Sequence, residues 1–203
     1  MKPGFSLDKI GRKFILASIS ERRIKLLSQL PFKFISVNSK VKEEEPKYHN
    51  PIKIVKFNAA LKCNSVAKKF KNAIVIGADT IVYINNEILH KPNSHKEAYT
   101  FLKKLSGKKH IVYTGIHLID TKTGKEISDY EKTSVYFREL KDYEIKFYIS
   151  KYNPFDKAGG YGIQDDFGCI FIKKIHGDFY NVVGLPLAKL YMNILKLCEL
   201  NNV

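Results

Sequence analysis

The segment Asp156–Gln164 has the composition of a recognition loop. Its nine residues include three glycines, an acid, a base, a Tyr and a Gln. Glycine suits backbone that turns tightly or approaches a ligand closely. The Gln164 amide offers both a donor and an acceptor to a molecule that must be distinguished from close analogues. The segment therefore predicts a loop that recognises a small polar molecule.

A second cluster, Ser18, Ser20, Arg22 and Arg23, combines hydroxyl and guanidinium groups. It falls where a short apolar strand ends and a helix begins, and the free N–H groups of a first helical turn favour an anion. Only four of the 35 cationic side chains are Arg, and guanidinium groups bind phosphate oxygens bidentately. The cluster predicts a phosphate site, although a simple Ser20 N-cap beside solvent-facing arginines explains the same pattern.

Asp79 is an acidic residue inside the apolar run Ala73–Ile84. Such a run is typical of a strand covered on both faces, where an ionised group is costly unless it is paired or binds a metal. One interpretation is a strand end at which Asp79 bonds to local backbone, because Gly77 can mark an irregularity. The other is a general base or a ligand of Mg²⁺ or Mn²⁺, cations that prefer oxygen ligands and accompany phosphate substrates.

Three further positions fit a site for a phosphate compound and a metal. The run Glu43–Glu45 can lend one carboxylate to a metal, although an acidic run is usually a solvated turn. Lys62, on a predicted helix, and Lys91, which precedes Pro92, are candidate phosphate contacts. Taken alone, both lysines would be ordinary surface residues.

The formal net charge of +15 raises the question of nucleic-acid binding, because a basic surface is typical of proteins that bind the phosphate backbone. The lysines, however, are spread along the whole chain and do not gather in one segment. Nucleic acid is therefore not the expected partner.

The hydrophobic pattern predicts alternating strands and helices, so a single α/β domain over 14–203 is expected, after an N-terminal extension, 1–13, with little structure. Ser20, Ser94 with Glu97, and Asp142 are expected N-caps, Pro186 is expected to begin the last helix, and Asn85-Asn86 suits a hairpin turn. The predicted strands are 14–17, 34–37, 73–84, 111–120, 134–140 and 169–175, and the predicted helices are 21–30, 51–70, 95–105, 143–152 and 186–197.

Three cysteines, Cys63, Cys169 and Cys198, show no metal-binding spacing and are expected to be buried, reduced thiols. No apolar run approaches the roughly 18 residues of a membrane span. A cytoplasmic protein without a membrane partner is therefore expected.

Assembled in order, these residues resemble one family, the Maf nucleotide pyrophosphatases, over 14–197. The resemblance rests on six segments, each of which is weak alone: Leu16–Arg23, Ile76–Thr80, Lys91–Pro92, Leu105–Gly107 with His110 and Thr114–Gly115, Asp156–Gln164, and Val182–Leu187. It implies an α/β fold with an elongated mixed β-sheet, flanking helices and a cleft between two lobes, often in a homodimer.

The resemblance also implies hydrolysis of a nucleoside triphosphate to the monophosphate and pyrophosphate with a divalent cation, Mg²⁺ or Mn²⁺. The family's catalytic carboxylate, described as the proton acceptor, falls on Asp79. In the branch that acts on dTTP and UTP, selectivity is attributed to residues that fall on Arg22, Thr80 and Gln164. A sister branch that acts on 7-methyl-GTP has Asp-Gln in place of Asp79-Thr80 and an extra Trp before its arginines, and this chain has neither.

In this interpretation Asp79 and Glu43 hold the cation, with Glu44 close behind Glu43. The expected phosphate contacts are Ser18, Ser20, Arg23, Lys62 and Lys91. The chain departs from the family at Glu21, where Pro is usual, and at Asp165, where many members have Gly.

We therefore expect a pyrophosphatase for dTTP and UTP, with modified pyrimidine nucleotides as further substrates. Two alternatives stay open. One is a cell-division regulatory protein that uses its basic surface on nucleic acid, and the other is a pyrophosphatase for non-canonical purine triphosphates.

Overall fold

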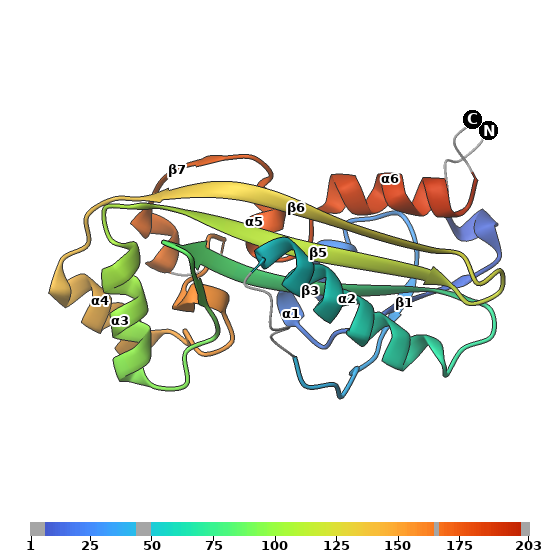
Figure 1. The fold of residues 1–203 in the computed structure, drawn as a ribbon, viewed down its shortest axis with the longest axis horizontal. Helices are drawn as coiled ribbons and strands as arrows, with labels where there is room; N and C mark the ends of the chain where they lie inside the picture. The colour runs from blue at the N-terminus through green and yellow to red at the C-terminus, as the bar shows by residue number, and fades with distance from the viewer. Residues whose placement is uncertain (1–6, 44–49, 165–166, 200–203) are drawn as a thin grey trace. The chain divides into compact units, whose positions relative to one another are not determined.

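The computed structural model describes residues 7–43, 50–164 and 167–199, and within them the chain forms a seven-stranded mixed sheet flanked by helices (Figure 1). The strand order is β2-β1-β3-β5-β6-β7, and β4 pairs with β3. β1 pairs in parallel with β2 and β3, whereas β4 and β7 pair antiparallel with β3 and β6. The strands are β1 (Lys13–Leu16), β2 (Phe34–Ser36), β3 (Ala73–Ile84), β4 (Glu87–Leu89), β5 (Lys109–Asp120), β6 (Glu126–Phe137) and β7 (Ile172–His176).

The helices follow the predicted alternation with the strands. They are α1 (Glu21–Leu27), α2 (Pro51–Ala67), α3 (His95–Leu105), α4 (Asp142–Lys151), α5 (Phe179–Val183) and α6 (Leu187–Leu197), with short 3-10 helices at Leu7–Ile10, Ala158–Gly160 and Phe167–Phe171. Ser94 caps α3 as predicted, since its Oγ accepts from the Glu97 N–H. Asn85 and Asn86 both have positive φ and form the β3–β4 hairpin turn, as expected for a type I′ loop.

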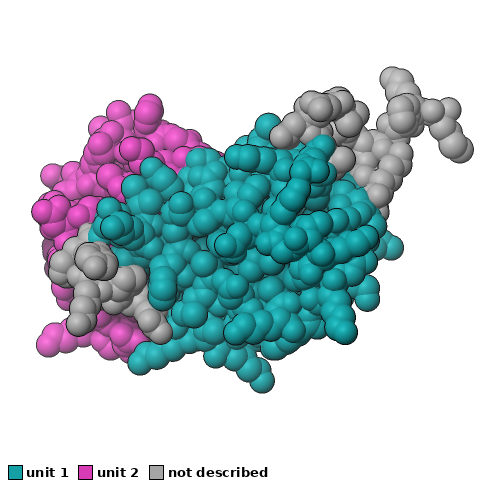
Figure 2. All heavy atoms as spheres, turned by 45° about the vertical axis from the view of Figure 1, so that its right-hand side comes forward, with its two compact units in different colours: residues 1–79, 115–130, 184–203 teal, residues 80–114, 131–183 magenta. Residues whose placement is uncertain are grey.

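The chain divides into two compact units, which Figure 2 colours separately. Unit 1 comprises residues 1–79, 115–130 and 184–203, and unit 2 comprises residues 80–114 and 131–183. The strands β3, β5 and β6 contribute residues to both units. Each unit has its own apolar core, around Ile15, Cys63 and Val75 in unit 1 and around Leu102, Phe137 and Tyr148 in unit 2. The division into an N-terminal extension and a single catalytic domain stays a prediction, as does the cleft.

Several predicted helix limits differ from the structure, and α2 ends at Ala67, three residues before the predicted limit. α1 ends at Leu27 because the next residues form tighter turns, in which the Gln29 and Leu30 N–H groups bond to carbonyls only three residues back. Asp142 is the first residue of α4 and not its cap, because its carboxylate accepts from the Tyr99 hydroxyl and the Lys103 ammonium. Pro186 is the N-cap of α6 and not its first residue, so the helix begins at Leu187, one residue later than predicted.

The predicted strand over 169–175 begins only at Ile172. The preceding Phe167–Phe171 segment is a 3-10 helix. Its turn brings the Phe167 and Phe171 rings within 5.9 Å of each other, and Phe171 packs edge-on against Tyr148 in the unit 2 core. Aromatic packing therefore outweighs the β-propensity of this segment.

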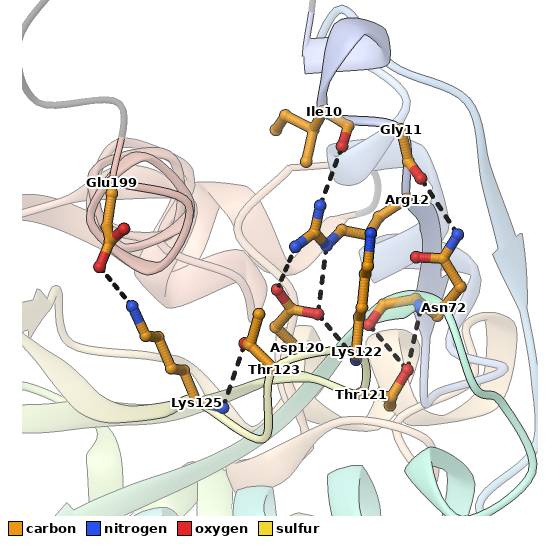
Figure 3. A network of polar contacts seen from close by, with 11 residues as sticks. Ile10, Gly11, Arg12, Asn72, Asp120, Thr121, Lys122, Thr123, Lys125 and Glu199 are labelled. Carbon is orange, nitrogen blue, oxygen red and sulfur yellow. Dashed lines mark hydrogen bonds and ion pairs between the residues drawn. The ribbon is translucent and has the colours of Figure 1, made fainter.

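Residues 7–13 are more ordered than the sequence indicates. Leu7 is buried, and the Arg12 guanidinium forms an ion pair of 3.0 Å with Asp120 while it donates to the Ile10 carbonyl (Figure 3). Figure 3 also shows an ion pair between Lys125 and Glu199. These contacts attach the segment before β1 and the end of α6 to the β5–β6 turn of unit 1.

All three cysteines are free thiols, as expected. Cys63 is buried, but Cys169 is exposed and Cys198 is partly exposed, so the predicted burial holds for Cys63 alone. Among the described residues, no helix is long and apolar enough to cross a membrane.

Two glycines let α2 lie unusually close to the sheet in unit 1. A Cβ on Gly77 would lie 2.2 Å from the Ala59 carbonyl oxygen, and one on Gly115 would lie 2.3 Å from the Val55 carbonyl oxygen. Both distances are far below van der Waals contact, so any side chain at either position would push the helix away. Gly77 therefore marks the close approach of a helix and not an irregularity of β3.

Candidate active site

Asp79, Lys62 and Glu43 form a charged cluster in unit 1. Asp79 is only 3% exposed and lies within β3, so the alternative of a strand end is wrong. The Lys62 ammonium, which reaches over from α2, is 2.7 Å from Asp79 Oδ1 and 2.7 Å from Glu43 Oε1. The close packing of α2 on Gly77 places Lys62 for this contact. A buried carboxylate is thus paired, as its burial requires.

The carboxylates of Asp79 and Glu43 fit a divalent cation. They come from separate segments and converge on one cationic group, and carboxylate oxygens are the preferred ligands of Mg²⁺ and Mn²⁺. Among the described residues there is no cluster of three or more His, Cys, Asp or Glu side chains that could hold a metal ion. Glu44 and Glu45 lie outside the described residues.

The serine and arginine cluster lies on both sides of the start of α1 in unit 1. Ser20 is the N-cap, but its side chain makes no capping bond, and the Ser18 Oγ accepts from the Ser20 N–H. Arg23 Nε donates to the Gly184 carbonyl at 2.9 Å, and Gly184 has a φ of 126°, which glycine adopts readily. The segment Val182–Leu187 therefore helps to position Arg23.

Arg23 also lies in the electrostatic field of the carboxylate cluster. Burial lowers the pKa of Arg23, and the negative charges of Asp79 and Glu43 oppose that shift. Arg22 and Arg23 are both partly buried, so they do not simply face water. Because α1 has only seven residues, any affinity of this cluster for an anion would come from the hydroxyl and guanidinium groups more than from the helix dipole.

Thr80, the residue after Asp79, belongs to unit 2 and joins a buried chain of hydroxyl groups. Its Oγ1 lies 3.0 Å from the Thr114 Oγ1 on the neighbouring strand β5. The Thr114 hydroxyl in turn donates to the backbone carbonyl of Asn181 in α5 at 3.0 Å. Thr114 and Asn181 are both fully buried. Thr80 is therefore held by a network and is not an isolated surface hydroxyl.

Asn181 and Thr133 are parts of this network that were not expected from the sequence. The Asn181 amide donates to the Val112 carbonyl at 3.1 Å and to the Thr133 hydroxyl at 2.9 Å, while Thr133 donates to the Asp178 carbonyl. Asn181 thus joins α5 to β5 and β6. The only sequence signal was a polar residue next to the motif Val182–Leu187, in a helix too short to predict.

The loop Asp156–Gln164 is tied to the segment around Lys91 in unit 2. The Gly159 N–H donates to the His90 carbonyl at 3.0 Å, and a Cβ on Gly160 would contact Pro92 at 3.4 Å. Both glycines have positive φ, 68° and 75°, so the three-glycine composition reflects both backbone shape and close packing. Lys91 therefore lies beside this loop, although its side chain is exposed.

A buried His110–Tyr161 pair anchors the same loop. His110 Nε2 lies 2.6 Å from the Tyr161 hydroxyl, and both rings pack edge-on against Phe137. Burial lowers the pKa of His110 to about 3 and raises the pKa of Tyr161, so both side chains are neutral near pH 7. His110 belongs to one of the six family segments, but the sequence alone indicated no role for it.

The structure brings the predicted site residues together in two groups. In unit 1, Asp79, Lys62 and Glu43 are in direct contact, and Arg23 lies within the electrostatic range of both carboxylates. In unit 2, Lys91 flanks the loop that contains the partly buried Gln164. Asp165 lies outside the described residues. Ser18, Ser20 and Arg22 belong to unit 1 with the carboxylates, and Thr80 belongs to unit 2.

Comparison with known proteins gives close relatives over nearly the whole chain. A dTTP/UTP pyrophosphatase of Thermoanaerobacter sp. (strain X514) is 48% identical over 185 residues, which cover 91% of this chain and 95% of that protein. A dTTP/UTP pyrophosphatase of Dictyoglomus thermophilum is 42% identical over 88% of this chain and 93% of its own length. A third, from Caldicellulosiruptor saccharolyticus, is 43% identical over 92% and 95% of the two chains.

The family model described as Maf-like protein matches residues 13–197. This range contains the carboxylate cluster, the serine and arginine cluster, the hydroxyl network and the glycine loop. The resemblance noted in the sequence is thereby confirmed: the chain belongs to the Maf-like protein family.

Proposed function

We propose that this protein is a nucleoside triphosphate pyrophosphatase that hydrolyses dTTP and UTP to the monophosphate and pyrophosphate. The observation that carries the proposal is the buried Asp79 carboxylate, paired with Lys62 and Glu43 and near Arg23, in a chain whose curated relatives are named dTTP/UTP pyrophosphatases. A carboxylate to accept a proton and cations to bind phosphate are what hydrolysis of a phosphoanhydride requires.

In the proposed reaction Asp79 is the general base. Its carboxylate accepts a proton from the attacking water, the water oxygen forms a bond to the α-phosphorus, and the bond from that phosphorus to the α–β bridging oxygen breaks. Pyrophosphate leaves with the negative charge that develops on the bridging oxygen. Lys62, Arg23, Lys91 and the hydroxyls of Ser18 and Ser20 are proposed to stabilise that charge and to hold the phosphates.

Lys62 has a second role, since its ammonium also neutralises the Asp79 carboxylate. When a triphosphate binds, its oxygens compete with the carboxylates for the Lys62 ammonium. We propose Asp79 and Glu43 as the ligands of a divalent cation, Mg²⁺ or Mn²⁺. When bound, such a cation neutralises phosphate charge and lowers the pKa of a water molecule.

Base recognition is assigned to Arg22, Thr80 and Gln164. The Gln164 amide can pair with the carbonyl and N3–H groups of thymine or uracil, whereas a purine presents mismatched groups. A mismatched buried hydrogen bond costs about 1–3 kcal/mol, which is sufficient for selectivity. The proposal also includes a homodimer and a cytoplasmic location, as the family resemblance implies, and size-exclusion chromatography with light scattering tests the dimer.

A substrate panel tests the proposed function. The full chain is incubated with dTTP, UTP, ATP, GTP, ITP and 7-methyl-GTP and either Mg²⁺ or Mn²⁺, and both pyrophosphate and phosphate are measured. We expect dTTP and UTP to be hydrolysed well ahead of the purine nucleotides, with pyrophosphate as the released product. A preference for ITP would favour a pyrophosphatase for non-canonical purines, and release of phosphate would contradict the proposed bond cleavage.

Asp79→Asn is the matched catalytic variant. The amide has the volume of the carboxylate but cannot accept the proton, so turnover should fall by about a hundredfold or more. Circular dichroism should show an unchanged fold, because the amide can still accept from Lys62. Near wild-type turnover in this variant would remove Asp79 from the proposed mechanism.

A further inference from the structure

We propose that one face of the unit 2 sheet binds single-stranded nucleic acid, with a base stacked on the Tyr136 ring and phosphates bound by lysines. This surface, the lysine–tyrosine face, consists of Lys109 on β5, Lys132 and Tyr136 on β6, and Lys174 on β7. None of these residues belongs to the candidate active site, so the inference does not depend on the proposed function.

The strands place these side chains on the same face of the sheet. On β6, Val135 and Phe137 are buried in the unit 2 core, so Tyr136 between them points to the other face. Lys174 is paired with Tyr136 in the register of β6 and β7. The ammonium groups of Lys174 and Lys109 lie 4.6 Å and 5.8 Å from the centre of the Tyr136 ring. Three neighbouring strands thus place two cations around one partly exposed aromatic ring.

The positive charge of the lysine–tyrosine face is not balanced by acidic side chains. Lys109, Lys132 and Lys174 are exposed, and within the part of the chain that the structure describes none of the three forms an ion pair. Glu131, the neighbour of Lys132, alternates to the opposite face with the buried Thr133. In the sequence these lysines are far apart, and the sheet brings them together. An anionic partner therefore fits this face.

The Tyr136 ring indicates which anionic partner fits best. Proteins bind single strands by stacking bases on aromatic rings while cations hold the neighbouring phosphates. In a duplex the bases stack on one another, so their faces are not available to a ring, and an acidic protein would use the lysines alone. Lys132 and Tyr136 are four residues apart on β6, a distance of about 13 Å. A strand of several nucleotides can contact the whole face, whereas a single nucleotide reaches only part of it.

Fluorescence anisotropy of the full chain with a labelled single-stranded DNA of about 12 nucleotides tests the inference. Tyr136→Leu removes the ring, and Tyr136→Phe keeps it as the matched control. A double variant, Lys109→Gln with Lys174→Gln, removes two charges from the lysine–tyrosine face. Its control, Lys68→Gln with Lys69→Gln, removes two exposed charges from unit 1. The lysine variants change only exposed side chains, so they fold even if Tyr136→Leu does not, and circular dichroism checks each variant.

We expect Tyr136→Leu to weaken binding by about tenfold and Tyr136→Phe to match the wild type, because stacking needs only the ring. The slope of log K against log salt concentration should become shallower by about 1.4 in the Lys109 and Lys174 double variant, since each phosphate contact to a single strand contributes about 0.7. The Lys68 and Lys69 double variant should keep the wild-type slope. A duplex of the same sequence should bind the wild type more weakly than the single strand.

Several results would overturn the inference. Equal affinities of Tyr136→Leu and the wild type would mean that the ring makes no stacking contact, and equal salt slopes of the two double variants would mean that the DNA binds elsewhere. A duplex that binds as tightly as the single strand, or polyglutamate that displaces it at equal charge, would indicate a surface for any polyanion. Absence of binding at low salt would also contradict the proposal.

Pyrophosphate release from dTTP separates this inference from the proposed function. The Tyr136 and lysine variants should hydrolyse dTTP as the wild type does, because they leave the candidate active site intact. If the wild type binds the single strand through this face but does not hydrolyse dTTP, the inference stands and the proposed function fails. If it hydrolyses dTTP but does not bind the single strand, the proposed function stands and the inference fails.

Discussion

At the scale of single residues, the Lys62 ammonium offsets the cost of burying the Asp79 carboxylate inside β3. Asp79 is nearly inaccessible to solvent, and Lys62 serves both Asp79 and the half-exposed Glu43 at the same distance. The single positive charge of Lys62 thus faces two negative carboxylates. A divalent cation can neutralise the excess negative charge. In the proposed metal site, the affinity for the cation and the stability of the fold would depend on the same three side chains.

Lys62→Met should destabilise the protein and make it more sensitive to metal. Loss of one partner of a buried ion pair costs about 3–5 kcal/mol, and less is expected here because the Glu43 side chain is 44% exposed and can turn to water. Without nucleotide, Mn²⁺ should raise the melting temperature of Lys62→Met more than that of the wild type, because the two carboxylates lack their internal cation. Differential scanning calorimetry measures both effects.

Lys68→Met is the control, since Lys68 is exposed at the C-cap of the same helix. It should match the wild type in melting temperature and in its response to Mn²⁺. Equal responses of Lys62→Met and Lys68→Met would mean that Asp79 and Glu43 do not bind the cation.

Gln164→Glu tests base recognition at the level of one side chain. The change replaces the amide donor with a second acceptor oxygen, so the variant should lose a bond to a base carbonyl. We expect kcat/KM for dTTP to fall by about tenfold or more, which corresponds to about 1–3 kcal/mol of transition-state binding. The products, the monophosphate and pyrophosphate, should be unchanged because Asp79 is still present. Equal kcat/KM values for dTTP in the variant and the wild type would show that Gln164 does not contact the base.

At the scale of elements, local sequence patterns predicted most of the strands and helices but few of the long-range contacts between them. The apolar runs gave β1, β3 and β5 within two residues of their limits, since burial on both faces leaves few polar residues in a strand. The N-terminal half of β6 was missed because six of its first seven residues, Glu126 and Ser128–Lys132, are polar or Tyr, without a regular alternation. Contacts over many residues, such as Arg23 with Gly184, leave no local periodicity to detect.

In the candidate site, too, the sequence indicated individual residues but not the long-range contacts between them. Lys62, Glu43 and Asp79 could be named from the family resemblance, but their shared ion pair depends on how close α2 lies to β3. That distance is set by Gly77 and Gly115, which the sequence showed only as single glycines. Asn181 and Thr133 could not be predicted, because their role arises only when α5, β5 and β6 are adjacent.

Gly77→Ala should damage both stability and activity. The new methyl group would lie 2.7 Å from Cys63 Cβ as well as 2.2 Å from the Ala59 carbonyl oxygen, so α2 must move outward. Overpacking of this kind typically costs about 1–3 kcal/mol, and a shift of α2 moves the neighbouring Lys62 away from Asp79. Urea denaturation and kcat/KM for dTTP measure the two effects.

Gly124→Ala provides the comparison for Gly77→Ala. Gly124 has a positive φ of 74° but nothing within 4 Å of a new Cβ. It should therefore lose only about 1 kcal/mol from backbone strain, with no change in turnover. A Gly77→Ala protein as active as Gly124→Ala would show that α2 tolerates the displacement.

At the scale of the whole molecule, acid should destabilise the fold through its buried histidines. Burial lowers the pKa of His110 to about 3 and also lowers the pKa of His117. Several carboxyl groups act in the same direction at lower pH. Burial by itself raises the pKa of the Asp120 carboxyl. The hydrogen bonds that Asp120 accepts from Arg12 and from the Lys122 N–H outweigh the effect of burial, so its pKa is lowered overall. Further protonation also adds positive charge to a chain that already carries +15.

The sign for His110 follows from the protons that each state binds. Below pH 6.5 the unfolded chain protonates His110 while the folded protein does not, so the stability that is present above pH 6.5 is lost as the pH falls towards 3. Between pH 7 and pH 5 this group alone should remove about 2 kcal/mol of unfolding free energy. Most carboxyl groups have not yet been protonated in that interval.

His110→Gln isolates this contribution, because the Gln amide can bond to the Tyr161 hydroxyl but does not titrate. Urea denaturation at pH 7 and pH 5 should show that the variant loses about 2 kcal/mol less than the wild type over the interval. His176→Gln, at an exposed position at the end of β7, should keep the wild-type pH dependence. If His110→Gln and the wild type lose equal stability, His110 is protonated in the folded protein. Its bond to Tyr161 would then be made by an imidazolium, and the loop that contains Gln164 would be anchored by a charge.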